Sequence, residues 1–340
     1  MSRFIPLHPC PLCDKTDGRC RETETGLILC MTLTTVGDRL LGWRCIKLSR
    51  DGHWGVWIPD DGQYDPQAEA ERQRELQIIR AVRAKAEIER RANAMPVVER
   101  DRHYRVLLDS LTLHPLDRAD LTRRGLTGEQ IKRAGFKSVE QWQQLDCALP
   151  HTLPGVQLDG RSLNAQPGYL CPIRNTQGQI VACQVRLREE TAGRYRWLTS
   201  ATKKRPNGAT PHYKNGELPL AVFRPSEVDS EAIALCEGTA AKPFILSERL
   251  NRITVGAAGG QFASSPHCFK VTLDKLSKEL ETRRLELYPD AGCVKNPGVM
   301  EQYCRMADLV KSWGFELGVM WWGQVEKGLD PDELFWRVAS

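Results

Sequence analysis

The sequence of 340 residues has no run of 18 or more apolar residues, which excludes a membrane-spanning helix of ordinary length. Its N-terminal stretch, Met1 to Pro9, has no apolar core followed by a small-residue cleavage site, so it is unlike a secretory signal. We therefore expect a cytoplasmic protein with no membrane partner. The length itself favours two or three domains, and 41% hydrophobic residues are enough to form their cores.

The chain also lacks a large excess of charge of either sign, since 48 Lys and Arg face 43 Asp and Glu. The distribution is more informative than the net value of +5. Residues 174–214 contain nine basic and two acidic residues, a local balance of +7. Such a basic strip favours a polyanionic partner, although an ordinary solvated loop is the alternative. The candidate nucleic-acid contacts in it are Arg174, Arg186, Arg194, Arg196, Lys203, Lys204 and Arg205.

Cysteine is not scarce, but its placement argues against a disulfide framework. Five of the twelve cysteines fall within the first 45 residues, and seven are scattered singly through apolar segments where we expect small core residues. The cluster contains the spacing C-x2-C-x6-C-x9-C, which suits four thiolates around a structural Zn²⁺. The predicted ligands are Cys10, Cys13, Cys20 and Cys30. Cys45 in place of Cys20 is the leading variant, and His8 and His53 are spare candidates.

The residue composition and hydrophobic pattern along the chain predict its structural elements in order. Residues 1–60 have the style of a small metal-stapled β unit, and residues 61–100 contain a long charged helix. Residues 168–187 predict a β-hairpin with its turn at 175–178. From residue 231 onward, four apolar runs, each predicted to be a strand, alternate with helical segments, which predicts a doubly wound α/β domain with a mainly parallel sheet. The fold class is therefore multi-domain α/β.

Acidic residues follow three of the four strands of this predicted sheet. Glu237 ends the first strand, Asp290 ends the third, and Asp330 and Asp332 follow the fourth. The ligand site of an open α/β sheet lies beyond the carboxyl ends of its strands, and oxygen ligands gathered there suit Mg²⁺ or Mn²⁺. Each acid alone is more often a helix cap or a surface group, so the prediction depends on their coincidence.

At these residues the chain resembles the Toprim family, whose fold is shared by DnaG-type primases, topoisomerases and some nucleases. The matching motifs are the strands ending at Glu237-Gly238 and at Asp290-Ala291-Gly292, and the segment 327–334. Upstream, residues 123–126, 131–136, 172–181 and 194–200 resemble the basic subdomain that precedes Toprim in primases. The strongest similarity is to a cyanobacterial group of plasmid replication and primase-like proteins.

The resemblance implies four parts and an activity. The parts are a zinc-binding module (1–60), a charged helical linker (61–100), a basic primase-type N-terminal core subdomain (101–226) and a Toprim-like catalytic domain (227–340). The implied activity is DNA primase: metal-dependent synthesis of RNA primers from ribonucleoside triphosphates on a single-stranded DNA template. Glu237, Asp290, Asp330 and Asp332 would hold the catalytic Mg²⁺ or Mn²⁺, and Lys242 and Lys327 would neutralise phosphates unless they are plain surface lysines.

Two departures from the family leave questions open. Primases usually carry Asp-x-Asp at the third strand, whereas Asp290 stands alone here; Glu286 is expected inside the strand and is a poor substitute. No helicase P-loop is present, so we expect a separate replicative helicase as partner. In the zinc module, Trp54 or Trp57 would stack template bases, unless they pack in the module's core.

Two other functions remain open at this point. One is a Toprim nickase or plasmid replication initiator, which requires a nucleophile such as Tyr288 or Tyr303, although both are more often packing residues and no His-x-His metal pair is present. The other is a non-catalytic protein that binds origin DNA or a replicative partner, which the single acid at Asp290 favours.

Overall fold

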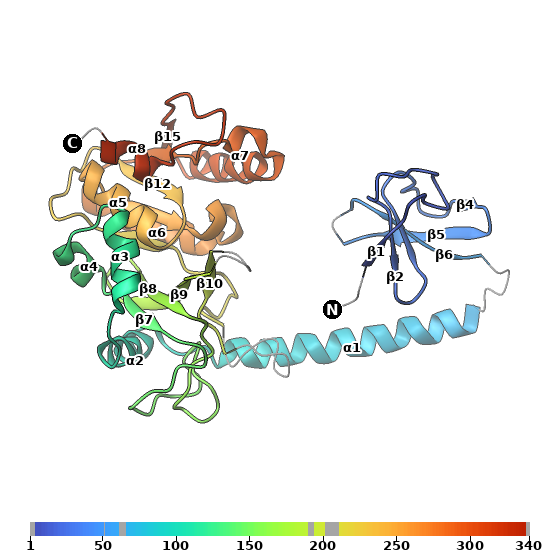
Figure 1. Ribbon diagram of the computed structural model, residues 1–340, viewed down its shortest axis with the longest axis horizontal. Coiled ribbons are helices and arrows are strands. Elements are labelled where there is room, and N and C mark those ends of the chain that lie inside the picture. The colour runs from blue at the N-terminus through green and yellow to red at the C-terminus, as the bar shows by residue number, and fades with distance from the viewer. Residues whose placement is uncertain (1–3, 51, 61–65, 190–193, 201–210, 338–340) are drawn as a thin grey trace. The chain divides into compact units, whose positions relative to one another are not determined.

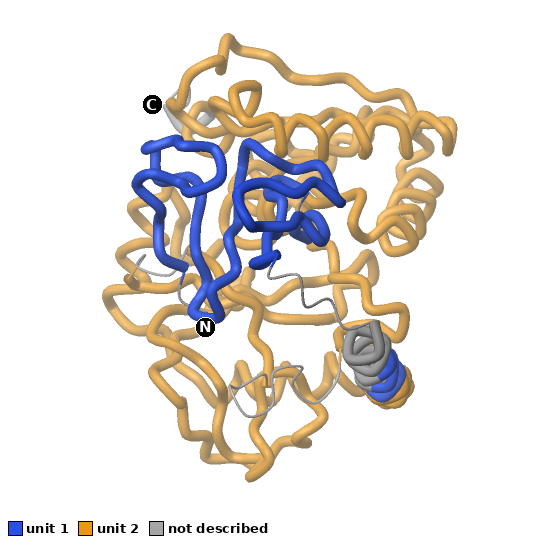
Figure 2. Tube along the Cα trace, turned by 90° about the vertical axis from the view of Figure 1, so that its right-hand side faces the viewer, with its two compact units in different colours: residues 1–84 blue, residues 85–340 orange. Residues whose placement is uncertain are grey.

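The computed structural model describes residues 4–50, 52–60, 66–189, 194–200 and 211–337. The chain divides into two compact units, residues 1–84 and 85–340, which Figure 2 colours separately. The division falls within the long helix α1 (Pro66–Ala92), which lies inside the expected linker. The four-part division of the sequence stays a prediction. Among the described residues, no helix is both long and apolar enough to cross a membrane.

The N-terminal unit contains a six-stranded antiparallel sheet in the order β1-β2-β3-β6-β5-β4. Its core combines Leu12, Ile28 and Trp57 with buried cysteines. Trp57 is 1% exposed and its Nε1 donates to Leu33 O at 2.9 Å, so it packs in the core and does not stack bases. Trp54 is partly exposed. The strands are β1 (Phe4–Pro6), β2 (Arg21–Thr23), β3 (Ile28–Cys30), β4 (Arg39–Leu40), β5 (Trp43–Leu48) and β6 (Gly55–Pro59).

After α1, the chain forms three helices and a four-stranded antiparallel sheet in the order β10-β9-β8-β7 (Figure 1). The predicted hairpin is confirmed: β8 and β9 pair, and Gly178 closes the turn by donating its N–H to Asn175 O at 3.0 Å. Thr127 caps α4 through a reciprocal pair of hydrogen bonds with Gln130. The elements are α2 (Val97–Asp109), α3 (Pro115–Arg123), α4 (Gly128–Ala134), β7 (Lys137–Val139), β8 (Gly168–Arg174), β9 (Ile180–Leu187) and β10 (Tyr195–Trp197).

The C-terminal sheet has five strands in the order β11-β13-β12-β14-β15. The four predicted strands are all present and parallel, and β11 adds an antiparallel edge that the sequence did not reveal. Side chains of one face, such as Leu235 and Leu287, pack with residues of α6 and α7, whereas Cys236 and Tyr288 of the other face pack with α5. This is the doubly wound arrangement that the alternation of strand and helix predicts.

The elements of this part of the chain are β11 (Ala221–Phe223), β12 (Ile233–Glu237), α5 (Ala241–Leu250), β13 (Thr254–Ala257), α6 (Pro266–Leu280), β14 (Arg284–Tyr288), α7 (Pro297–Ser312), β15 (Glu316–Val319) and α8 (Pro331–Arg337), with 3-10 turns η1 (Ala258–Gly260), η2 (Phe262–Ser264) and η3 (Cys293–Lys295).

Glu286 lies inside β14, as expected, and its side chain is 4% exposed. Its carboxylate pairs with Arg252 and with Arg284, and Tyr288 Oη donates to its Oε2 at 2.9 Å. These partners satisfy a charge that would otherwise be costly to bury. Glu286 is therefore held in the sheet as a structural charge and is not available as a metal ligand.

Replacing this carboxylate should destabilise the sheet. We expect Glu286→Ala to lower the thermal midpoint of unfolding by about 5 °C, because Arg252 and Tyr288 lose a buried partner at a cost of about 2 kcal/mol. Glu279→Ala, which removes an exposed ion pair with Arg224, should shift the midpoint by less than about 2 °C. Differential scanning calorimetry measures both, and equal shifts would contradict the structural role of Glu286.

Candidate functional site

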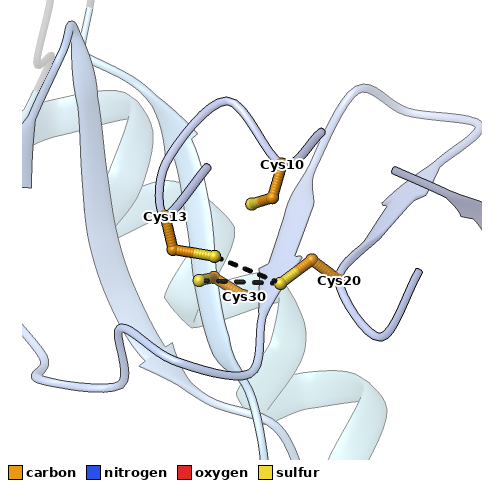
Figure 3. Close-up of side chains that lie close together, drawn as sticks. All are labelled: Cys10, Cys13, Cys20 and Cys30. Atoms are coloured by element: carbon orange, nitrogen blue, oxygen red, sulfur yellow. Dashed lines mark hydrogen bonds between the residues drawn. The ribbon is translucent and has the colours of Figure 1, made fainter. Parts of the chain in front are cut away.

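The four predicted zinc ligands converge in the N-terminal unit (Figure 3). The Sγ atoms of Cys10, Cys13, Cys20 and Cys30 all lie within 4.8 Å of one another. Cys10 and Cys13 come from the turn after β1, Cys20 precedes β2, and Cys30 ends β3. Four thiols converging from three parts of a small sheet are the donor set of a closed tetrahedral Zn²⁺ site.

Backbone N–H groups surround these thiols and favour their charged form. Met31 N–H donates to Cys20 Sγ at 3.5 Å, and Leu33 N–H donates to Cys30 Sγ at 3.3 Å. Burial raises the pKa of Cys20 and Cys30 above the usual range. Burial also acts on Cys13, but hydrogen bonds from Lys15 N–H and neighbouring side chains outweigh it and lower its pKa to about 7. The donors present therefore suit a cation that is bound by thiolates.

The alternative zinc ligands lie outside this cluster. Cys45 directs its Sγ to Lys47 O at 3.8 Å, His8 Nδ1 is bonded to Thr16 O at 2.7 Å, and His53 stacks edge-on against Trp54. The variant in which Cys45 replaces Cys20 is therefore wrong. All twelve cysteines are free thiols. Six of the seven outside the first 45 residues are buried or partly buried, but Cys304 is exposed, so the expectation that all seven are interior fails there.

A second group of predicted residues lies at the carboxyl ends of the parallel strands. We call Glu237, Asp290, Asp330 and Asp332 the acidic edge. Glu237 is the last residue of β12, and Asp290 lies two residues beyond β14, the neighbouring strand. The segment after β15 returns to the same place, since Gly292 N–H donates to Gln324 O at 3.0 Å and Ala291 N–H donates to Asp330 Oδ1 at 3.2 Å.

Lys242 lies between two carboxylates of the acidic edge. It is the second residue of α5, and its Nζ is 2.5 Å from Asp290 Oδ2 and 3.0 Å from Asp330 Oδ2. Burial opposes the charge of this lysine, but the two carboxylates raise its pKa above the usual range. Burial raises the pKa of Asp290 to about 6, against the effect of Lys242. Lys242 is therefore a fixed internal cation rather than a surface lysine.

Asp332, on α8, has a different cationic partner. Its Oδ2 accepts from Arg124 Nη2 at 3.1 Å, and both side chains are largely buried. Arg124 also donates to Tyr195 Oη at 3.3 Å, and the Arg186 guanidinium lies over the Tyr195 ring. Burial opposes the charge of Arg124, but Tyr195 and Asp332 raise its pKa. This chain of contacts links the four-stranded sheet to the acidic edge, and nothing in the sequence indicates it beyond the Arg-Gly motif at 124–125.

The acidic edge retains acceptors that no described residue fills. Asp290 Oδ1 and Tyr303 Oη are both buried without a hydrogen-bond partner among the described residues. A Cβ built at Gly260 would lie 3.7 Å from Tyr303 Oη and 3.9 Å from Glu237 Oε2, so these two oxygens flank the same point. Unsatisfied buried oxygens beside carboxylates are donors that a divalent cation takes, although in the described part of the chain no three of these carboxylates form a group like that of the four thiols.

The two tyrosines considered as nucleophiles are both buried. Tyr288 is 2% exposed and donates to Glu286, and Tyr303 is 6% exposed. Burial raises the pKa of both hydroxyl groups, which opposes the formation of a phenolate nucleophile. Burial therefore disfavours both residues as DNA-cleaving nucleophiles.

The basic strip is only partly available as a surface. Arg174 Nη1 donates to Gly178 O at 3.2 Å and so closes the predicted hairpin, and Arg188 is bound to Asp117 and Glu140. Arg194 and Arg196 are exposed on or beside β10. Lys327 is exposed, and its backbone lies against Gly292. Lys203, Lys204 and Arg205 lie outside the described residues.

Comparison with known proteins concerns the fold. The sequence matches no family model and no curated protein. The DnaG primase catalytic domain bound to single-stranded DNA is similar with a TM-score of 0.50 and 15% identity, over 70% of this chain and 74% of that one. The zinc-binding and RNA polymerase domains of Aquifex aeolicus primase are similar with a TM-score of 0.49 and 14% identity, over 72% of this chain and 59% of that one. A primase domain from Pseudomonas aeruginosa has a TM-score of 0.47 and 17% identity, over 68% of this chain and 73% of that one. The likeness to the first of these structures shows that this chain has the fold of a DnaG primase catalytic domain.

Proposed function

We propose that this protein is a DNA primase that makes RNA primers on single-stranded DNA with Mg²⁺ or Mn²⁺. The observation that carries the proposal is the acidic edge of a primase-type fold. Asp290 and Asp330 share Lys242, and Glu237 Oε2 flanks the same point as the buried, unpartnered Tyr303 Oη. The similar structures support a nucleic-acid partner, since one of them is a primase catalytic domain bound to single-stranded DNA.

The residues of the acidic edge have distinct roles in this proposal. Glu237 and Asp290 would hold the divalent ion, which would orient nucleotide phosphates and stabilise the charge of in-line displacement. The 3′-hydroxyl of the growing primer attacks the α-phosphorus of the incoming nucleotide, and pyrophosphate leaves. Lys242 fixes Asp290 and Asp330, and Arg124 fixes Asp332, so these carboxylates are positioned before substrate arrives.

The exposed arginines of the basic strip hold the template in this proposal. Arg196 lies on β10 and Arg194 directly precedes it, in the same sheet as Arg186, whose contact with Tyr195 leads to Arg124 and the acidic edge. Contacts of arginine with phosphates are strong and independent of sequence. Lys327 would neutralise nucleotide phosphates. A separate replicative helicase and a cytoplasmic location stay predictions, and nothing observed supports a role in plasmid replication in particular.

The cysteine cluster carries a structural Zn²⁺ in this proposal. Four thiolates leave no open position for substrate, so the ion stabilises the N-terminal unit rather than taking part in chemistry. Trp54, which is partly exposed and bonded to Arg19 O, remains the candidate for base stacking in this unit.

Primer synthesis should depend on Asp330. With single-stranded DNA, labelled ribonucleotides and Mg²⁺ or Mn²⁺, the wild-type chain should give short RNA products on a denaturing gel. Asp330→Asn should abolish them, because the neutral amide no longer pairs with Lys242 or contributes charge to the edge. Asp274→Asn, an exposed substitution on α6, is the matched control and should retain synthesis. Undiminished synthesis by a folded Asp330→Asn protein would contradict the assignment.

The zinc content of two cysteine variants should show that Cys20, and not Cys45, is a zinc ligand. Cys20→Ser should lose about one equivalent of zinc per chain, because one of four thiolates is removed. Cys45→Ser should retain it, since Cys45 Sγ is bonded to Lys47 O outside the cluster. Elemental analysis of purified protein measures both. Loss of zinc in Cys45→Ser and its retention in Cys20→Ser would refute the ligand set.

Template binding should depend on the arginines beside β10. Arg194→Ala with Arg196→Ala should weaken binding of a single-stranded oligonucleotide and reduce the slope of log affinity against log salt by about 0.7 for each phosphate that is no longer neutralised. Arg305→Ala, an exposed arginine of α7, should leave the slope unchanged. Fluorescence anisotropy at several salt concentrations measures this, and an unchanged slope in the double variant would exclude this surface as the template site.

A further inference from the structure

Lys242 bridges two carboxylates of the acidic edge. Its Nζ touches Asp290 and Asp330 together, at 2.5 and 3.0 Å. A divalent ion bridging the same two oxygens, Asp290 Oδ2 and Asp330 Oδ2, would have to displace the ammonium group. The side chain is only 16% exposed, so it is enclosed where it lies.

The position of Lys242 on its helix shows that the carboxylates hold it. A cation at a helix N-terminus is disfavoured by the helix dipole, and Lys242 is the second residue of the ten-residue helix α5. Burial is also unfavourable to its charge. The two direct ion pairs offset both costs, so Asp290 and Asp330 hold the ammonium group of Lys242 as they would hold a bound cation.

The remaining charge of the acidic edge corresponds to one divalent ion. Its four carboxylates carry four negative charges, and Lys242 and Arg124 neutralise two of them by direct contact. Two negative charges remain. Asp290 Oδ1 and Tyr303 Oη have no hydrogen-bond partner among the described residues, and Tyr303 Oη and Glu237 Oε2 flank the same point beside Gly260.

We propose that the acidic edge binds one divalent ion, at Glu237 and Asp290, and that the ammonium group of Lys242 permanently replaces a second one. This deepens the proposed function and rests on it for the identity of the site. It also accounts for the single acid at the third strand: a site with a built-in cation between Asp290 and Asp330 needs fewer carboxylate ligands than a site that holds two metal ions.

The test counts the Mn²⁺ ions bound by the full, zinc-loaded chain. The protein is titrated with Mn²⁺ up to millimolar concentration, and the electron paramagnetic resonance signal of the free ion gives the amount that is bound. The wild-type chain should bind one ion that Asp290→Asn abolishes. Lys242→Gln should bind two, because the amide leaves Asp290 and Asp330 free of a cation. Lys270→Gln, which removes an exposed lysine of α6, should still bind one.

Two ions or none on the wild-type chain, or an unchanged count in a folded Lys242→Gln protein, would overturn the inference. The wild-type count decides even if Lys242→Gln fails to fold. Because the count uses neither nucleotide nor template, failure of the two proposals can be told apart. A chain that binds one ion but makes no primer would refute the proposed function alone, and primer synthesis with two ions bound would refute only the replacement by Lys242.

Discussion

The contact of Lys242 with Asp290 and Asp330 is the interaction on which the candidate site depends. It joins the N-terminus of α5, the end of β14 and the loop before α8, which are separate in sequence. Without a cation at this point, the carboxylates of Asp290 and Asp330 would lie near each other at a partly buried sheet edge, where like charges repel strongly. The same contact that makes the edge stable therefore also limits how many metal ions it can accept.

The second internal cation connects the two sheets of the C-terminal unit. Arg124 pairs with Asp332 and touches Tyr195, which lies opposite Arg186 on β9. The surface proposed to hold template and the edge proposed to hold metal are thus joined by side chains in direct contact. In a primer-synthesising enzyme this would set the distance between the template strand and the reacting phosphate. The zinc-type cluster of the N-terminal unit, by contrast, is closed and complete within itself.

The parts of this description that the sequence predicted were those that local spacing determines. The spacing of Cys10, Cys13, Cys20 and Cys30 lies within 21 residues, and the acidic residues at the strand ends follow from the alternation of strand and helix. The ion pairs could not be predicted, because Lys242 and Asp330 are 88 residues apart and Arg124 and Asp332 are 208 apart. The burial of single residues was only partly predictable: core packing of Trp57 was one of the two possibilities considered, whereas Cys304 was expected to be interior and is exposed.

Anomalous diffraction from crystals soaked in Mn²⁺ tests the central claim, that the acidic edge is a one-metal site with a built-in ammonium group, most directly. The account predicts one anomalous peak in this unit, in contact with Glu237 and Asp290, with Lys242 still lying between Asp290 and Asp330. A peak between Asp290 and Asp330 with Lys242 turned away, or no peak at the edge, would contradict it.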